Sequence, residues 1–171
     1  RVLAGRAPVA WPAVGATPAD LVRSDGGSRL FRYRATAPRT PGGLPLLLVC
    51  SLINRPYVMD LLPERSVVRR FLDSGFDVWL LDWADPRPED ARHGVEEYAL
   101  GRLPRAAAAV CAQAGTDRLH LLGYCMGGTF ALMAIAAGLL PAASLLAPAR
   151  PVAMHDSGLL SAWCRAPGLD A

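Results

Sequence analysis

Lysine is absent from this chain of 171 residues, although 18 of its side chains are basic. Every basic side chain is therefore an arginine, which excludes the Walker A phosphate loop and the pyridoxal Schiff base, because both depend on lysine. The formal net charge is only +3, so the chain lacks the basic surplus that is typical of nucleic-acid binding. We expect no nucleic-acid partner.

Cysteine is scarce, and its positions form no closely spaced pair. Cys50, Cys111, Cys125 and Cys164 include no C-x-x-C motif, so we expect no zinc or other metal site. Wide spacing in a chain that is long enough to build a core indicates reduced thiols in a cytoplasmic protein. Cys50 ends an expected strand and Cys111 lies in an expected helix, so both are expected to fill the core.

Aspartate, glutamate and arginine are missing between residues 119 and 149, a length that would suffice to span a membrane. Glycines and Pro141 divide this stretch, so we interpret it as strand, helix and strand buried in a sheet, with no transmembrane segment. Residues 1–19 are rich in proline and glycine and contain no continuous apolar stretch of signal-peptide length.

Short apolar stretches alternate with helical patterns along most of the chain. Strands are expected at residues 30–34 (at a sheet edge), 46–49, 76–83, 119–122 and 142–146. Helices are expected at residues 57–72, with a break near Pro63, and at residues 95–114 and 129–137. This alternation predicts an α/β fold with a doubly wound, mainly parallel sheet.

The most informative motif is Gly-Tyr-Cys-Met-Gly-Gly at residues 123–128, between an expected strand and an expected helix. This order predicts the nucleophile elbow of an α/β-hydrolase, with Cys125 at the tip in place of the usual serine. Glycine at Gly123 and Gly127 suits a close backbone approach, and Gly128 suits tight packing of the helix on the strand. The alternative is a buried structural cysteine in a glycine-rich turn of another α/β fold.

In an elbow of this kind Cys125 is the expected catalytic nucleophile. The free N–H groups at the start of the following helix favour the thiolate, which is the attacking form. The backbone N–H of Met126 is expected to donate to the oxyanion that forms when the sulfur attacks a carbonyl. A second donor is expected in the loop after the strand at residues 46–49, at Leu52 or Ile53.

Three stretches, at residues 45–49, 52–61 and 66–83, together with the elbow resemble the poly(3-hydroxyalkanoate) synthases, especially the class III type. The resemblance covers about residues 28–165. It implies an acyltransferase that polymerises (R)-3-hydroxyacyl-CoA through a thioester on Cys125, with no cofactor besides the coenzyme A of its substrate. It also implies a cytoplasmic protein at a polyester granule surface that works with a second synthase subunit or as a homodimer.

The same resemblance implies a histidine base and a supporting aspartate downstream of the elbow, which we expect to lie outside this chain. The sheet is then truncated after the strand that follows the elbow. Residues 1–27 are interpreted as an irregular N-terminal segment and residues 28–171 as a partial α/β-hydrolase-like catalytic domain.

Three histidines and one aspartate within the chain are candidate substitutes for these partners. His120 is expected to pack in the sheet and His93 to be solvated in a polar loop. His155 follows the last expected strand and is the only plausible substitute base. Asp82 is expected to cap a loop with backbone hydrogen bonds instead of serving in a triad.

Two other functions stay open at this point. The first is a cysteine α/β-hydrolase of the dienelactone-hydrolase type, which has a similar elbow and would act on small esters or lactones. Residues 52–83 resemble the synthases instead. The second is a catalytically dead, truncated binding protein, which the missing triad partners would explain.

Overall fold

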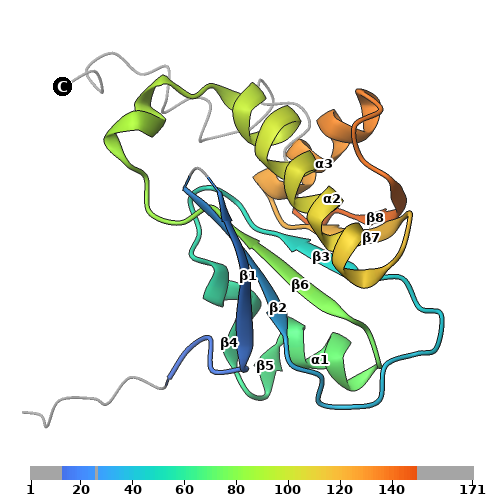
Figure 1. Ribbon diagram of the computed structural model, residues 1–171. Helices are drawn as coiled ribbons and strands as arrows, with labels where there is room; N and C mark the ends of the chain where they lie inside the picture. Colours follow the sequence, from blue (N-terminus) through green and yellow to red (C-terminus); the bar gives the residue numbers. More distant parts are fainter. Residues whose placement is uncertain (1–12, 26, 150–171) are drawn as a thin grey trace, which may run out of the picture.

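A twisted six-stranded sheet runs through the part of the protein that the computed structural model describes, residues 13–25 and 27–149 (Figure 1). Its strands lie in the order β1 (Ala19–Asp25), β2 (Ser28–Tyr33), β6 (Val78–Asp82), β3 (Leu46–Val49), β7 (Leu119–Gly123) and β8 (Ala142–Leu146). Neighbouring strands from β6 to β8 are parallel, whereas β2 is antiparallel to both β1 and β6. The expected mainly parallel sheet is confirmed.

Helices cover both faces of this sheet, as a doubly wound fold requires. Helices α2 (Leu103–Ala114) and α3 (Met126–Ala136) lie on one face, and α1 (Val67–Asp73) lies on the other (Figure 1). A π-helical segment, η3 (Glu97–Arg102), leads directly into α2. Among the described residues, no helix combines the length and apolar character that crossing a bilayer would take.

Strand β3 shows why its short apolar run is buried on both sides. Leu47 and Val49 belong to the core cluster under α2 and α3, whereas Leu46 and Leu48 belong to the cluster under α1. Successive side chains of a strand point to opposite faces, so a strand covered by helices on both faces needs apolar residues at every position. All four side chains are buried.

The expected helix over residues 57–72 is wrong for most of that range. The chain forms a 3-10 turn, η1 (Pro56–Met59), then a hairpin of β4 (Asp60–Leu62) and β5 (Arg65–Ser66), and only then α1. The buried carboxylate of Asp60 accepts hydrogen bonds from the Thr17 backbone N–H and hydroxyl, both at 2.8 Å, and from the Ser66 hydroxyl at 2.5 Å. This contact with a distant segment fixes the hairpin and is not visible in local periodicity.

The expectation of an irregular segment over residues 1–27 is wrong for residues 19–25, which form β1. Because β1 pairs with β2, the strand expected at the sheet edge lies one position inside it. A bulge between Leu21 and Arg23 breaks the alternation of side chains in β1. Its charged residues and half-exposed Leu21 suit an edge strand, but they give no clear two-residue hydrophobic pattern.

Candidate active site

Cys125 lies at the tip of the tight turn that joins β7 to α3. Its backbone has φ 54° and ψ −123°, a positive-φ conformation that non-glycine residues rarely adopt. Hydrogen bonds hold the turn on both sides: the Tyr124 N–H donates to the Val49 carbonyl at 2.9 Å, and the Cys125 N–H donates to the Pro148 carbonyl at 3.0 Å. The strained conformation is therefore fixed by the neighbouring backbone.

Two glycines of the turn make room for this geometry. A Cβ atom at Gly127 would lie 2.2 Å from the Val49 carbonyl oxygen and 2.7 Å from that of Cys50. A Cβ atom at Gly123 would lie 2.5 Å from the Cα of Gly128. These distances are far below van der Waals contact with rigid backbone atoms, so no side chain fits at either position.

The described cysteines differ in how far they are buried. Cys125 is partly exposed, whereas Cys50 and Cys111 lie in the core with 1% and 8% exposure, which confirms their expected role as core residues. Burial, together with the nearby charge of Asp82, raises the pKa of the Cys50 thiol to about 12. Burial also raises the pKa of Cys111, so both stay protonated at neutral pH. Cys164 lies outside the described residues.

Helix α3 begins at Met126, immediately after the cysteine. In its first turn the Gly127 and Gly128 N–H groups donate to the Tyr124 and Cys125 carbonyls, both at 3.0 Å, whereas no acceptor among the described residues takes the Met126 N–H at the positive end of the helix dipole. The Met126 side chain is partly buried and packs against the core cluster under α2 and α3. The Met126 N–H stays a candidate for the oxyanion donor expected from the sequence.

The loop after β3 carries both candidates for the second donor. The Ile53 N–H donates to the Ser51 hydroxyl oxygen at 3.4 Å, and the Ile53 side chain is 80% exposed. Leu52 is half-buried and packs against the core. At the start of this loop the Cys50 carbonyl accepts a 2.8 Å hydrogen bond from the indole N–H of Trp83.

An aromatic cluster surrounds that tryptophan. Trp83 makes edge-to-face contacts with Tyr98 and Phe130, at centroid distances of 5.6 and 6.0 Å. Tyr98 and Phe130 stack at 6.4 Å. The guanidinium of Arg102 lies 4.8 Å from the centroid of the Tyr98 ring, which is a cation–π distance. The cluster joins β6, η3 and α3 behind the elbow.

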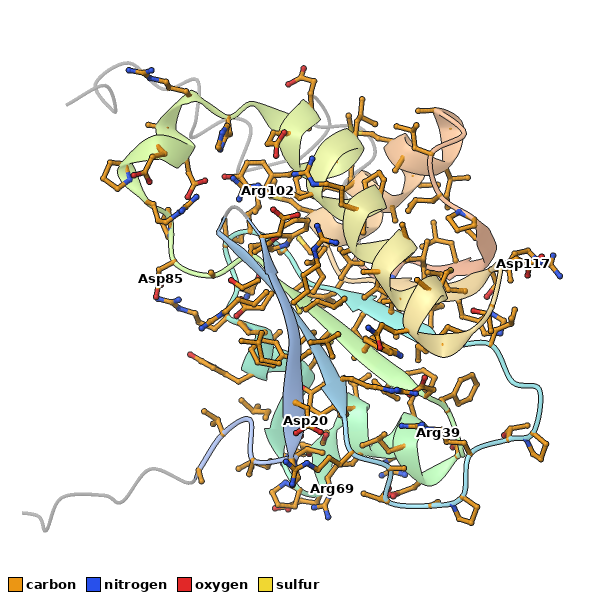
Figure 2. All side chains as sticks on the ribbon, in the orientation of Figure 1. Asp20, Arg39, Arg69, Asp85, Arg102 and Asp117 are labelled. Atoms are coloured by element: carbon orange, nitrogen blue, oxygen red, sulfur yellow. The ribbon has the colours of Figure 1, made fainter. Side chains whose placement is uncertain are left out.

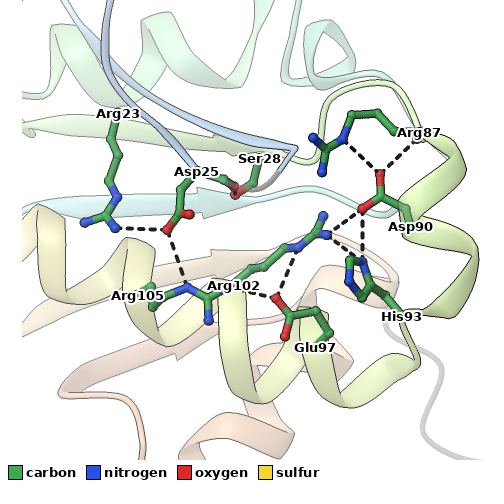
Figure 3. A network of polar contacts seen from close by, with 9 residues as sticks. All are labelled: Arg23, Asp25, Ser28, Arg87, Asp90, His93, Glu97, Arg102 and Arg105. Atoms are coloured by element: carbon green, nitrogen blue, oxygen red, sulfur yellow. Dashed lines mark hydrogen bonds and ion pairs between the residues drawn. The ribbon is translucent and has the colours of Figure 1, made fainter.

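Arg102 is almost fully buried, with 3% exposure, and it is the centre of a polar network (Figure 3). Its Nη2 donates to the Asp90 carboxylate at 2.6 Å and lies 2.8 Å from His93 Nδ1, while its Nε lies 3.5 Å from Glu97. The Arg102 hydrogen bond, with a second from the Arg87 N–H, holds the pKa of Asp90 well below its usual range. Figure 2 shows Arg102 near the middle of the molecule, beside α2.

Sequence reasoning missed this network, because a single arginine carries little information in an arginine-rich chain. His93 is exposed, as expected of a solvated side chain, but its ring also contacts Asp90 and Arg102, which was not expected. One signal was available: Arg102 falls on the buried helical face with Ala99, Leu103 and the core residues of α2. A charge at such a position needs a buried partner.

The other candidate partners of the nucleophile lie elsewhere. His120, near the start of β7, has its Nδ1 2.8 Å from the Ser144 hydroxyl, at the end of the strand away from Cys125. Asp82 accepts the Ala84 N–H at 2.9 Å, as expected for a loop cap, and also pairs with Arg29. Within residues 13–25 and 27–149, neither His93 nor His120 hydrogen-bonds to Cys125; His155 lies outside the described residues.

An apolar hollow of about 270 Å³ opens beside the elbow on the α1 face of the sheet. It is lined by Val58, Met59, Val67, Leu122, Tyr124 and Pro148. Leu122 and Tyr124 belong to the strand and turn that lead to Cys125, so the hollow lies beside the elbow. Among the described residues, none that lines the hollow is charged.

Comparison with known proteins identifies the family to which this fold belongs. The model of the α/β hydrolase fold family matches residues 45–145, which is more than half of the chain. The chain belongs to the α/β hydrolase fold family. Two solved structures share the fold: a predicted CIB-like hydrolase from Thermoplasma acidophilum, with a TM-score of 0.54 at 14% identity, and a putative lipase from Acinetobacter baumannii, with 0.55 at 17%. They are matched over 79% and 77% of this chain, and over 63% and 40% of their own chains.

Within the α/β hydrolase fold family, the chain is similar to curated proteins named poly(3-hydroxyalkanoate) polymerase subunit PhaC. That of Haloferax mediterranei is 41% identical over 120 residues, which is 70% of this chain and 24% of the relative. That of Thiocystis violacea is 34% identical over 157 residues, which is 91% of this chain and 44% of the relative. The resemblance to the synthases is confirmed, and the chain spans less than half the length of these relatives.

Proposed function

We propose that this chain carries the nucleophile of a poly(3-hydroxyalkanoate) synthase, an acyltransferase that accepts (R)-3-hydroxyacyl groups from coenzyme A on Cys125. The observation that carries the proposal is the partly exposed cysteine at φ 54° between β7 and the start of α3. The similarity of the chain to PhaC polymerase subunits, at 34–41% identity, supports hydroxyacyl-CoA as the substrate class. As the resemblance implies, the enzyme would act at a polyester granule surface, with a second synthase subunit or as a homodimer.

In the proposed reaction the Cys125 thiolate attacks the carbonyl carbon of the CoA thioester. A carbon–sulfur bond to Cys125 forms, and the carbonyl oxygen becomes an oxyanion that accepts hydrogen bonds from backbone N–H groups. When the oxyanion collapses, the carbon–sulfur bond to coenzyme A breaks, and the released CoA thiolate takes up a proton. The acyl group is then held as a thioester on Cys125.

The Met126 N–H is the proposed first oxyanion donor, because it opens α3 next to the attacking sulfur. For the second donor, the hydrogen bonding favours Leu52 over Ile53. The Ile53 N–H is directed at the Ser51 hydroxyl, whereas among the described residues no acceptor takes the Leu52 N–H. The apolar hollow beside Tyr124 would receive the hydroxyacyl chain, whose hydrocarbon part needs no charged partner.

The first acylation uses the thiolate that the start of α3 favours, whereas polymerisation also needs a base to activate the next hydroxyl group. His93 is engaged by Arg102, and His120 lies at the far end of β7. We therefore place the base, and the aspartate that supports it, outside residues 13–149.

The direct test incubates the purified chain with (R)-3-hydroxybutyryl-CoA and follows both free CoA and the intact mass of the protein. We expect release of CoA together with a mass increase of one hydroxybutyryl group. Cys125→Ala should abolish both signals, and Cys111→Ala is the matched control that should retain them. Equal labelling of Cys125→Ala would contradict the proposal. Hydrolysis of small lactones without CoA release would favour the dienelactone-hydrolase alternative.

A further inference from the structure

Trp83 connects the end of β6 to the loop that carries the proposed second oxyanion donor. Its indole N–H donates to the Cys50 carbonyl at 2.8 Å, across 33 residues of sequence, and the side chain is only 7% exposed. A buried carbonyl oxygen needs such a partner, and an indole offers a single donor with a fixed direction. The hydrogen bond therefore selects one orientation of the Cys50 carbonyl.

The same carbonyl also touches the elbow. The Cys50 oxygen would lie 2.7 Å from a Cβ atom at Gly127, so it packs directly on the start of α3. A peptide group is planar, so the direction of the Cys50 carbonyl also sets the direction of the Ser51 N–H and the entry of the chain into the loop. Ser51 is fully buried, and Leu52 follows it directly. Rotation of this peptide would move the Leu52 N–H.

The tryptophan is itself held firmly. Tyr98 and Phe130 contact its ring edge-to-face, and Arg102 fixes Tyr98 from the other side through its cation–π contact. Arg102 is tied to Asp90 by a buried ion pair. A group that positions a catalytic donor must be locked by its surroundings, because small displacements of an oxyanion donor lose much of its effect.

We infer that Trp83 is a positioning residue for acyl transfer: its indole N–H holds the Cys50 carbonyl so that the Leu52 N–H points at the oxyanion formed over Cys125. The inference rests on the proposed function. In this role Trp83 does not contact the substrate. It affects the direction of the Leu52 N–H and leaves the nucleophilicity of the Cys125 thiol unchanged.

Trp79, near the start of β6, offers a matched control. It is fully buried, and its indole N–H donates to the Asp77 carboxylate at 3.0 Å, at the end of β6 away from the elbow. Trp79→Phe and Trp83→Phe remove the same group from two buried sites. Only Trp83→Phe releases the Cys50 carbonyl.

The experiment measures two reactions of the same sulfur in each variant. Transfer of the hydroxybutyryl group from (R)-3-hydroxybutyryl-CoA develops an oxyanion, whereas alkylation of Cys125 by iodoacetamide displaces iodide and develops none. For Trp83→Phe we expect acyl transfer to fall about tenfold or more, with alkylation unchanged within about twofold. For Trp79→Phe we expect both rates to stay close to those of the parent chain.

Several results would overturn the inference. Acyl transfer by Trp83→Phe equal to that of Trp79→Phe would do so, as would a parallel loss of both reactions, which would indicate general disturbance of the elbow. If Trp83→Phe does not fold, benzothienylalanine at position 83 removes the N–H and keeps the ring shape, and the same outcomes apply. A parent chain that accepts no acyl group would overturn the proposed function as well. Failure of the inference alone would show only in the comparison between the two tryptophan variants, so the two failures are distinguishable.

Discussion

The elbow and the Arg102 network lie on the same side of the sheet but are held together by different forces. Between residues 119 and 149 the chain carries no acidic or basic side chain except His120, and the elbow is fixed by backbone hydrogen bonds and close glycine contacts. The neighbouring segment of η2 (Pro88–Arg92), η3 and the start of α2 is fixed by buried charges (Figure 3). The elbow should therefore respond to volume, and the network to charge and pH.

The largest effect is expected from adding one methyl group to the elbow. In Gly127→Ala the new Cβ would lie 2.2 Å from the Val49 carbonyl, so β3 and α3 must separate. We expect acyl transfer to fall at least a hundredfold and the free energy of unfolding to fall by about 3 kcal/mol or more, in CoA-release and urea-unfolding measurements.

The matched control is Gly115→Ala, at the end of α2. Gly115 has φ 68°, but a Cβ atom there would meet nothing within 4 Å. Its expected loss is about 1 kcal/mol, from backbone strain alone, with acyl transfer unchanged. Similar losses of activity in the two variants would contradict the claim that the elbow is sensitive to close steric contact and not to backbone strain.

The next largest effect is expected from removing the central charge of the network. Arg102→Met keeps much of the side-chain volume but leaves the Asp90 carboxylate without its closest cation. We expect the thermal midpoint to fall by about 5 °C or more, in circular dichroism melts. Arg105→Met is the control, because Arg105 is about half exposed and its ion pairs with Glu97 and Asp25 should contribute little. Equal shifts would contradict the central place of Arg102.

A smaller effect concerns pH and separates the network from the elbow. Because the folded-state pKa of Asp90 lies below its unfolded value, the folded protein releases this proton more readily. The resulting stability is present above about pH 4 and is lost as pH falls through the folded pKa. Asp90→Asn should be less stable than the parent chain at pH 7 and should lose less stability on acidification.

Urea unfolding between pH 2.5 and 7 measures this difference, with Asp85→Asn as the control. Asp85 forms an exposed ion pair with Arg55, so its replacement should leave the pH profile nearly unchanged. A profile for Asp90→Asn parallel to that of the parent chain would show that the network does not couple folding to this proton.

The smallest intervention compares the reactivity of the cysteines and needs no mutation. Iodoacetamide at neutral pH should modify Cys125 first, because it is partly exposed, and should leave Cys50 and Cys111 unmodified until the protein unfolds. Peptide mapping after graded exposure measures the order. Early modification of Cys50, at the start of the loop after β3, would show that this loop opens readily.

The elbow could be predicted from the sequence because its determinants are local. A strand, two glycines around Cys125 and an apolar helix lie within residues 119–137, and their spacing is sufficient to define the turn. The parallel strands could be predicted for the same reason, since each is a short apolar run buried on both faces.

What the sequence did not reveal depends on distant contacts. The hairpin of β4 and β5 depends on Asp60 receiving hydrogen bonds from Thr17, 43 residues earlier. Strand β1 depends on backbone pairing with β2 across a bulge. The bond from Trp83 to Cys50 likewise joins two strand ends that are adjacent only in the folded sheet. Such contacts leave no periodic signal in a single sequence.

The most direct measurement of the central claim is peptide mapping of the chain after a single exposure to (R)-3-hydroxybutyryl-CoA. We predict one hydroxybutyryl group per chain, in thioester linkage on the peptide that contains Cys125 and removable by hydroxylamine. An acyl group on Cys50 or Cys111, or none on any cysteine while CoA is released, would contradict the assignment of Cys125 as the acyl acceptor.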